Sequence, residues 1–116
     1  MNYPLDYAKQ KMAELGFAKY ITVPVLVEVP ASGEASLPET NDYNMLVNFY
    51  TETGVPNGKL EADNTAINLN AALLNSTFYK VRFLHGKIAI QNPTLKTLYV
   101  EFLRLIPVIT EQPTDQ

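Results

Sequence analysis

Residues 20–29 read YITVPVLVEV, and every second side chain in this run is a branched aliphatic one. The odd-numbered positions hold Ile21, Val23, Val25, Val27 and Val29. Alternation with period two and β-branched residues predicts a strand. Pro24 lies inside the run and has no backbone N–H to donate. We therefore expect this strand at the edge of a sheet or at a bulge.

A hairpin is predicted further along the chain, at His85-Gly86. Val81 and Phe83 share one face of the segment before it, and Ile88 follows it. Glycine suits the tight reversal that joins two antiparallel strands. A two-residue loop there would pair Phe83 with Ile88, so that one apolar face continues across both strands.

Residues 95–106 predict a long strand after the turn at residues 92–94. In the register that we prefer, the face shared with Ile88 and Ile90 carries Leu98, Val100 and Phe102. The alternative register would bury Glu101 without a partner, which is costly. The second face carries Tyr99, Leu103 and Leu105. That face is too apolar for free solvation, so we expect a helix, a second sheet or a partner to cover it.

A short amphipathic helix is predicted at the N-terminus, over about residues 4–15. Pro4 suits the first turn, and Gly16 supplies the left-handed residue that ends the helix. Its apolar stripe comprises Leu5, Ala8, Met12 and Leu15. A helix of this length is not stable alone in water. Its stripe must therefore dock on the sheet of its own chain or on a neighbouring molecule.

The middle of the chain gives weaker patterns. Alternation predicts strands over residues 43–50 and 65–70, and residues 71–74 are compatible with a helical turn. Asn57-Gly58 predicts a tight turn, because both residues tolerate positive φ.

Residues 30–42 are rich in Ser, Gly, Glu and Pro, and predict an exposed acidic loop. Its carboxylates are Glu34, Glu39 and Asp42. They lack the spacing of a calcium-binding loop. A solvated loop is therefore preferred over a metal site.

These elements predict one mainly β domain that spans residues 1–116. The β region covers about residues 20–110, and a polar tail covers residues 111–116. We expect a β-sandwich or small jelly roll of about six to eight strands, preceded by the short helix.

Composition excludes several classes of function. The net charge is -3 and the nine Lys and Arg residues are scattered, so nucleic acid is not an expected partner. Cysteine is absent, which excludes disulfides and thiolate metal sites. No secretory signal is visible, and no apolar run approaches the ~20 residues of a transmembrane helix. Charged residues make up only 18%, which suggests that part of the surface is covered.

The inventory of catalytic side chains is poor. His85 is the single histidine, and it precedes a glycine, so it is interpreted as a turn residue. Two of the three carboxylates Glu52, Glu61 and Asp63 could form a glycosidase-like pair, but nothing in the sequence fixes the distance between the carboxyl groups that such a pair requires. We predict no catalytic, cofactor-binding or metal-ligating residue, and no small-molecule ligand.

The overall pattern resembles small β-rich structural proteins of bacteriophage virions, of the single jelly-roll vertex or capsid-associated type. The residues that carry the resemblance are 20–29 and 77–107. The resemblance rests on no diagnostic motif and assigns a functional role to no residue of this chain. It implies a location in the virion, with the cytoplasm as the alternative, and partners that are copies of this chain and other structural proteins. Oligomers would be cyclic.

The leading prediction is a non-enzymatic structural subunit that acts by packing. Its predicted interface comprises Leu5, Met12, Leu15, Tyr99, Leu103 and Leu105. Two other classes stay open. One is a small module whose tyrosines and asparagines bind a glycan or peptide, and the other is a small β-barrel enzyme.

Overall fold

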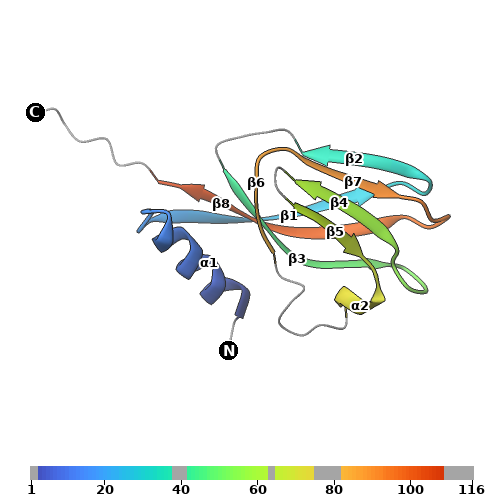
Figure 1. Cartoon of the computed structure of the whole chain (residues 1–116), viewed down its shortest axis with the longest axis horizontal. Coiled ribbons are helices and arrows are strands. Elements are labelled where there is room, and N and C mark those ends of the chain that lie inside the picture. Colours follow the sequence, from blue (N-terminus) through green and yellow to red (C-terminus); the bar gives the residue numbers. More distant parts are fainter. Residues whose placement is uncertain (1–2, 38–41, 63–64, 75–81, 109–116) are drawn as a thin grey trace, which may run out of the picture.

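The computed structural model describes residues 3–37, 42–62, 65–74 and 82–108. These residues form two helices and a series of strands (Figure 1). The elements are α1 (Tyr3–Glu14), β1 (Tyr20–Val29), β2 (Gly33–Leu37), β3 (Tyr43–Thr51), β4 (Gly58–Ala62), β5 (Thr65–Leu69), α2 (Ala71–Leu74), β6 (Arg82–His85), β7 (Ile88–Asn92) and β8 (Leu98–Pro107).

The strands of the described residues form two antiparallel four-stranded sheets. Sheet A has the order β1-β8-β3-β6, and sheet B has the order β2-β7-β4-β5. Each strand pairs with its counterpart from the other end of the series: β1 with β8, β2 with β7, β3 with β6 and β4 with β5. A long hairpin rolled into two sheets has this order, which is that of a jelly roll. The predicted fold class is confirmed.

The core lies between the two sheets. Its fully buried members include Val29, Leu46, Phe49, Leu60, Ile88, Ile90, Leu98, Val100 and Phe102. The predicted core face of β8 is confirmed, because Leu98, Val100 and Phe102 lie with Ile88 and Ile90 in one cluster. The register predicted across the turn at residues 92–94 is wrong, since β7 and β8 lie in different sheets and do not pair. Burial of apolar area at roughly 25 cal/mol per Å² is the main term that holds the sheets together.

The predicted hairpin at His85-Gly86 is wrong. β6 belongs to sheet A and β7 to sheet B, so this turn carries the chain across the sandwich. Phe83 pairs with Met45 of β3 instead of Ile88. Gly86 has a positive φ of 89°, as a tight turn requires. Such a turn can connect strands of two different sheets as well as the two strands of a hairpin. Val81 lies outside the described residues.

A β-bulge interrupts the alternation predicted for β3. The register against β8 shifts between Leu46 and Asn48. Leu46 and Phe49 therefore both face the core, although they are three residues apart. Met45 faces the opposite side, toward α1. A bulge that re-aims side chains in this way is invisible to a strict period of two.

The predicted turn at Asn57-Gly58 is also wrong. Neither residue has positive φ, and the glycine that does is Gly54, at 81°. Gly58 is buried as the first residue of β4. A Cβ there would lie 2.8 Å from Cδ2 of Leu98 and 2.9 Å from the carbonyl oxygen of Gln91. Close approach, and not backbone freedom, requires glycine at this position.

The segment predicted as an acidic loop contains strand β2. Residues 33–37 pair with β7 in sheet B, with Gly33 opposite Asn92. Glu34 is exposed on this strand, and Glu39 lies outside the described residues. The other predictions for the middle of the chain are confirmed, since β5 alternates and residues 71–74 form α2. Oδ1 of Asn70 caps this turn by accepting a hydrogen bond from the N–H of Leu73 at 3.1 Å.

Helix α1 docks on the outer face of sheet A. Ala8 and Met12 are fully buried against Met45 and Leu105. The helix ends as predicted: Gly16 has φ 89°, and the N–H of Phe17 donates to the carbonyl of Met12 at 2.8 Å. The second apolar face of β8 is thus covered, in part, by the helix of its own chain.

Candidate interaction surfaces

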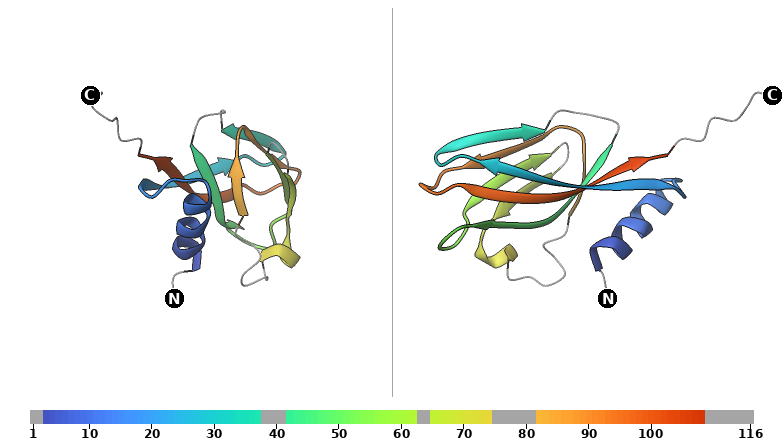
Figure 2. Two further views of the ribbon diagram at one scale, coloured as in Figure 1. Left: turned by 60° about the vertical axis from the view of Figure 1, so that its left-hand side comes forward. Right: turned by 180° about the vertical axis from the view of Figure 1, so that it is seen from behind.

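Strands β1 and β8 extend beyond sheet B. They pair without a register shift from Val29 opposite Leu98 to Tyr20 opposite Pro107. Figures 1 and 2 show both strands running past the second sheet toward α1. We call residues 20–23 and 104–107 the extension. Side chains on its core-facing side have no opposing sheet to pack against.

The two faces of the extension differ. Tyr20 and Leu105 face α1 and belong to the cluster around Met12. The opposite side, which we call the open face, carries Ile21, Val23, Arg104 and Ile106, with Val108 just beyond it. Ile21 and Val23 are 54% and 37% exposed. A contiguous exposed aliphatic surface of this kind is typical of an interaction site.

Polar contacts fix the extension. The N–H of Val108 donates to the carbonyl oxygen of Lys19 at 3.1 Å, and thereby closes the end of the strand pair. Nε of Arg104 lies 3.4 Å from Oδ1 of the buried Asn44. The guanidinium is therefore held on the open face, beside Val23.

The edge position of β1 is confirmed. Sheet A ends at this strand, and Pro24 lies near its middle. Because pairing with β8 continues unbroken through Pro24, the missing N–H falls on the outer edge. A proline on an open edge disfavours the addition of another strand. A partner is therefore expected to bind the face of the extension and not to add a strand at the edge of sheet A.

A groove of about 450 Å³ lies on the helix side of sheet A. Its lining is mostly aliphatic and comprises Leu5, Pro24, Val25, Leu26, Val47, Glu101, Phe102 and Leu103. Leu5 and Leu26 are 43% and 53% exposed. Glu101 is the single charged side chain in this lining. The groove therefore suits an aliphatic occupant that carries a positive charge.

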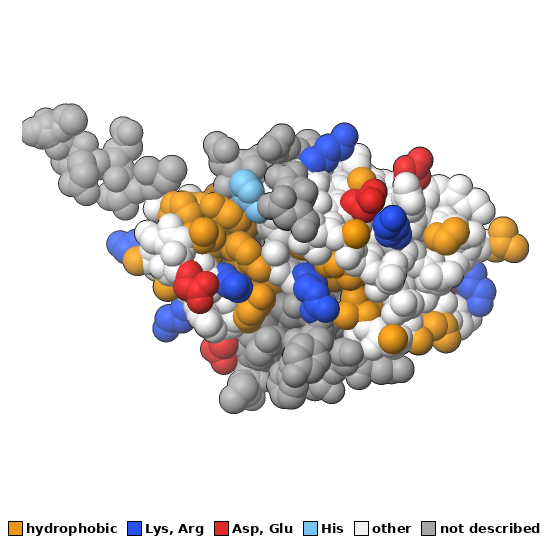
Figure 3. Space-filling view, in the orientation of Figure 1, with side chains coloured by type: hydrophobic (Ala, Val, Ile, Leu, Met, Phe, Trp, Pro, Cys, Tyr) orange, Lys and Arg blue, Asp and Glu red, His pale blue; other side chains and the backbone are white. Residues whose placement is uncertain are grey.

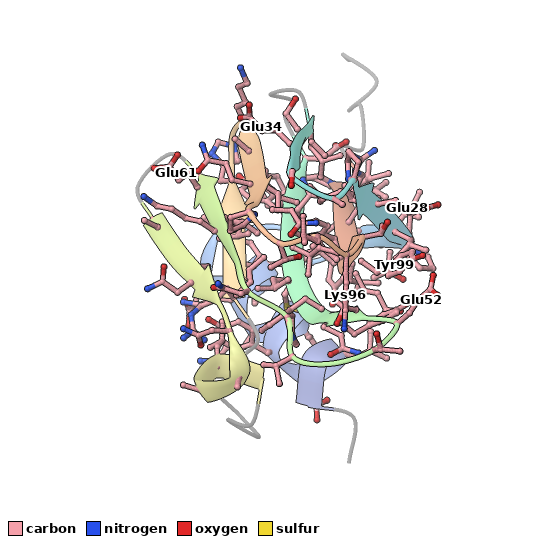
Figure 4. The ribbon with its side chains drawn as sticks, turned by 90° about the vertical axis from the view of Figure 1, so that its right-hand side faces the viewer. Glu28, Glu34, Glu52, Glu61, Lys96 and Tyr99 are labelled. Atoms are coloured by element: carbon pink, nitrogen blue, oxygen red, sulfur yellow. The ribbon has the colours of Figure 1, made fainter. Side chains whose placement is uncertain are left out.

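The carboxylate of Glu101 is half-buried, and no hydrogen bond or ion pair joins it to any residue that the structure describes. Glu101 pairs with Leu26, and the next pair on the same face of the sheet is Glu28 with Tyr99. We call Glu28, Glu52 and Glu101 the acidic rim. Figure 4 shows Glu28 and Glu52 beside Tyr99 at one end of the molecule, on the side opposite Glu34 and Glu61.

Tyr99 links the acidic rim to the sheet. Its hydroxyl donates to Oε1 of Glu52 at 2.8 Å, and its ring stacks on Tyr50 with 5.2 Å between centroids. The hydrogen bond to Glu52 raises the pKa of Tyr99, and burial and the negative charges of Glu52 and Glu28 add to this effect.

The structure separates the residues of the predicted interface. Met12 and Leu105 are fully buried inside the chain, and Leu15 is exposed at the end of α1. Leu5 and Leu103 come together in the groove, whereas Tyr99 is at the acidic rim. The open face was missed because Ile21 and Val23 continue the alternation of the core residues. The mismatch between a long β1 and the five-residue strands of sheet B is the signal that could have found it.

A second pocket, also about 450 Å³, lies on sheet B and is polar. Its side chains include Ser32, Asn57, Lys59, Asn68, Gln91 and Asn92. The amide of Asn92 is already engaged by backbone carbonyls. The remaining amides could hydrogen-bond to a sugar, but no tyrosine belongs to this lining. Tyr43, Tyr50 and Tyr99 lie on sheet A.

His85 ends β6 and is exposed, with its ring 4.7 Å from that of Tyr43. Tyr43 also stacks on Phe83 at 5.3 Å. Figure 3 shows hydrophobic side chains gathered beside the histidine. Within the described residues, no group of three or more His, Cys, Asp or Glu side chains could hold a metal ion. Nor does any described helix have the length and apolarity to cross a membrane.

The carboxylates considered as a glycosidase pair do not converge. Glu52 follows β3 of sheet A, whereas Glu61 lies on β4 of sheet B and forms an ion pair with Lys59 at 3.6 Å. Figure 4 shows the two glutamates on different sides of the molecule. Asp63 lies outside the described residues.

Comparison with family models, with curated proteins and with solved structures found no match. The open face, the groove and the polar pocket are therefore the features from which a function can be inferred.

Proposed function

We propose that this chain is a non-enzymatic structural subunit of a virion, which works by packing against copies of itself and other subunits. The observation that carries the proposal is the open face of the extension. Ile21, Val23 and Ile106 form an aliphatic surface on a strand pair that has no second sheet behind it.

Physical chemistry favours an assembled role for such a surface. Two paired strands alone are marginally stable in water, and α1 covers only one side of the extension. Each Å² of aliphatic area that a neighbour covers contributes roughly 25 cal/mol. An exposed apolar patch on a strand pair is otherwise an aggregation hazard that a monomeric protein would avoid.

Fold and composition are compatible with this role. Jelly rolls occur in viral capsid proteins, but also in lectins and cupins, so the fold alone does not decide the function. The low charged fraction of 18% and the likeness to small phage structural proteins favour the capsid-associated alternative.

Sedimentation velocity of the full chain and two variants tests the proposal. Val23→Asp places a charge on the open face, and Leu95→Asp is the matched control at a leucine that is 88% exposed in the turn before β8. We expect the unaltered chain and Leu95→Asp to form oligomers, and Val23→Asp to be monomeric with an unchanged circular dichroism spectrum. A monomeric unaltered chain at every concentration, or equal behaviour of both variants, would overturn the proposal.

A second candidate function is glycan binding in the polar pocket, favoured by the side-chain amides of Asn57, Asn68 and Gln91 in its lining. A glycan array, followed by thermal denaturation with any glycan that binds, tests it. Binding that raises the melting temperature of the chain, and that Gln91→Ala abolishes, would support this function. A blank array would remove it.

A further inference from the structure

We infer that copies of this chain assemble head to tail, with the open face of one copy seated in the groove of the next. This inference rests on the proposed function and names the surface that receives the extension. Three observations carry it: the complementary charges of the two surfaces, the carboxylate of Glu101, which has no partner among the described residues, and the position of the surfaces on opposite sides of sheet A.

The charges of the two surfaces are opposite. The open face carries Arg104, and Lys19 lies exposed at its end. The groove contains Glu101, and Glu28 and Glu52 continue the acidic rim beside it. Complementary charge promotes encounter and fixes the register of an interface. The occupant that suits the groove, aliphatic with an adjacent cation, is therefore present on the chain itself.

Glu101 needs a cation if its groove is filled. The carboxylate is half-buried, and no described residue pairs with it. An aliphatic occupant without charge would remove more of its water and leave the carboxylate uncompensated, which is costly. Arg104 lies across from Val23 on the open face. Seating Val23 in the groove would bring a guanidinium close to Glu101.

A two-fold contact of the open face with itself is disfavoured. It would bring Arg104 and Lys19 toward the same residues of the second copy, and like charges oppose association. It would also leave the groove unfilled. Pairing of two β1 edges is disfavoured by Pro24, as described above.

The two surfaces can be occupied together. The open face is on the core side of sheet A, and the groove is on the side where α1 docks. A contact between different surfaces of identical copies propagates, and it ends only when a ring closes. A standard interface buries about 800 Å² on each partner, more than a few aliphatic side chains supply. A single contact should thus be weaker than the contacts within a closed ring, and a dimer held by one contact should form only at high protein concentration.

Mixing two variants tests the geometry. Val23→Asp removes the open face but keeps the groove, whereas Leu26→Asp removes the groove but keeps the open face. Head-to-tail assembly predicts that each variant is monomeric alone and that the mixture forms a dimer with one copy of each. Native mass spectrometry resolves the two copies, because the substitutions change the mass differently.

The other outcomes are decisive. If Leu26→Asp assembles as well as the unaltered chain while Val23→Asp is monomeric, head-to-tail packing is excluded, although the proposed structural role stands. Two monomeric variants that give no mixed dimer at the highest concentration would also exclude it. An unaltered chain that never assembles would overturn the structural role itself.

Reversal of charge provides an independent test. We expect Glu101→Lys or Arg104→Glu alone to weaken assembly by about tenfold, and the double variant to recover most of the loss. Lys19→Glu with Glu28→Lys repeats the exchange at two exposed positions, where folding is not at risk. Failure of both double variants to recover assembly would overturn the predicted pairing.

Discussion

The buried side-chain amide of Asn92 donates a hydrogen bond to the carbonyl oxygen of Val29, 3.1 Å away and 63 residues distant in sequence. The same Nδ2 also donates to the carbonyl oxygens of Pro30 and Lys96, at 3.1 and 2.6 Å. Its Oδ1 accepts from the hydroxyl of Thr94 at 2.7 Å. One side chain thus joins the end of β1 in sheet A to the end of β7 in sheet B.

Asn92→Ala should therefore lower the free energy of unfolding substantially. It removes the amide and leaves the carbonyl oxygen of Val29, in a buried position, and those of Pro30 and Lys96, in part-buried positions, without this donor, at about 3 kcal/mol. Urea denaturation followed by circular dichroism measures the change. Asn68→Ala, at an exposed position of β5, is the control and should cost less than about 0.5 kcal/mol. Equal effects of the two substitutions would show that Asn92 does not join the sheets.

The docking of α1 predicts unequal effects along its apolar stripe. Met12 is fully buried, whereas Leu15 is 46% exposed. Met12→Ala should lower the free energy of unfolding by about 2–4 kcal/mol because it opens a cavity against Leu105. Leu15→Ala should cost less than about 1 kcal/mol by the same denaturation assay. A helix that detaches from the sheet in solution would make both substitutions nearly silent.

Leu105→Asp should prevent folding. The substitution places a carboxylate in the fully buried cluster between α1 and sheet A, beside Met12 and Met45, where no cation is available within the described cluster. Leu95→Asp, in an exposed turn, controls for the added charge. A folded Leu105→Asp protein with an unchanged circular dichroism spectrum would contradict the packing of α1.

Two glycines should respond to alanine for different reasons. Gly58→Ala forces a Cβ to within 2.9 Å of the carbonyl oxygen of Gln91, and backbone cannot move aside. We expect a loss of about 2–3 kcal/mol. Gly16→Ala meets no atom within 4 Å but must adopt φ 89°, at about 1–2 kcal/mol. Asparagine tolerates this φ, so Gly16→Asn should recover stability, whereas Gly58→Asn should not.

The raised pKa of Tyr99 predicts a loss of stability in strong alkali. Because the folded state holds the phenol neutral, the stabilising contribution is complete below the ordinary pKa of 10.0 and is lost as pH rises through the raised value. Ultraviolet titration of Tyr99, identified by comparison with Tyr99→Phe, measures it. Glu52→Gln should move the pKa back toward its ordinary value, since the hydrogen bond to Glu52 is the largest cause. An unmoved pKa would contradict that assignment.

The sequence predicted those elements that depend on neighbouring residues in the chain. The alternation of residues 20–29 predicted β1. Pro24 predicted its position at an edge, because proline has no N–H to donate to a neighbouring strand on both sides. The face of β8 that enters the core followed from the cost of burying Glu101. Gly16 predicted the end of α1, because a left-handed residue is needed there.

Features set by distant partners could not be predicted. The choice between a hairpin and a crossing at Gly86 depends on which sheet β7 joins, and the turn itself is the same in both cases. The open face could not be predicted because Ile21 follows the same alternation as the core residue Val29. Whether sheet B covers Ile21 depends on the lengths of the strands of sheet B, which lie elsewhere in the sequence. The groove combines side chains from α1, β1, β3 and β8, and no single segment carries its signature.

The most direct test of assembly through the open face is the reactivity of a thiol placed on it. The chain contains no cysteine, so Val23→Cys and Leu95→Cys each introduce a single thiol. We predict that alkylation of Val23→Cys slows as the protein concentration rises, because neighbouring copies cover the open face, whereas the rate for Leu95→Cys stays constant. A rate for Val23→Cys that does not depend on concentration would contradict assembly through this surface.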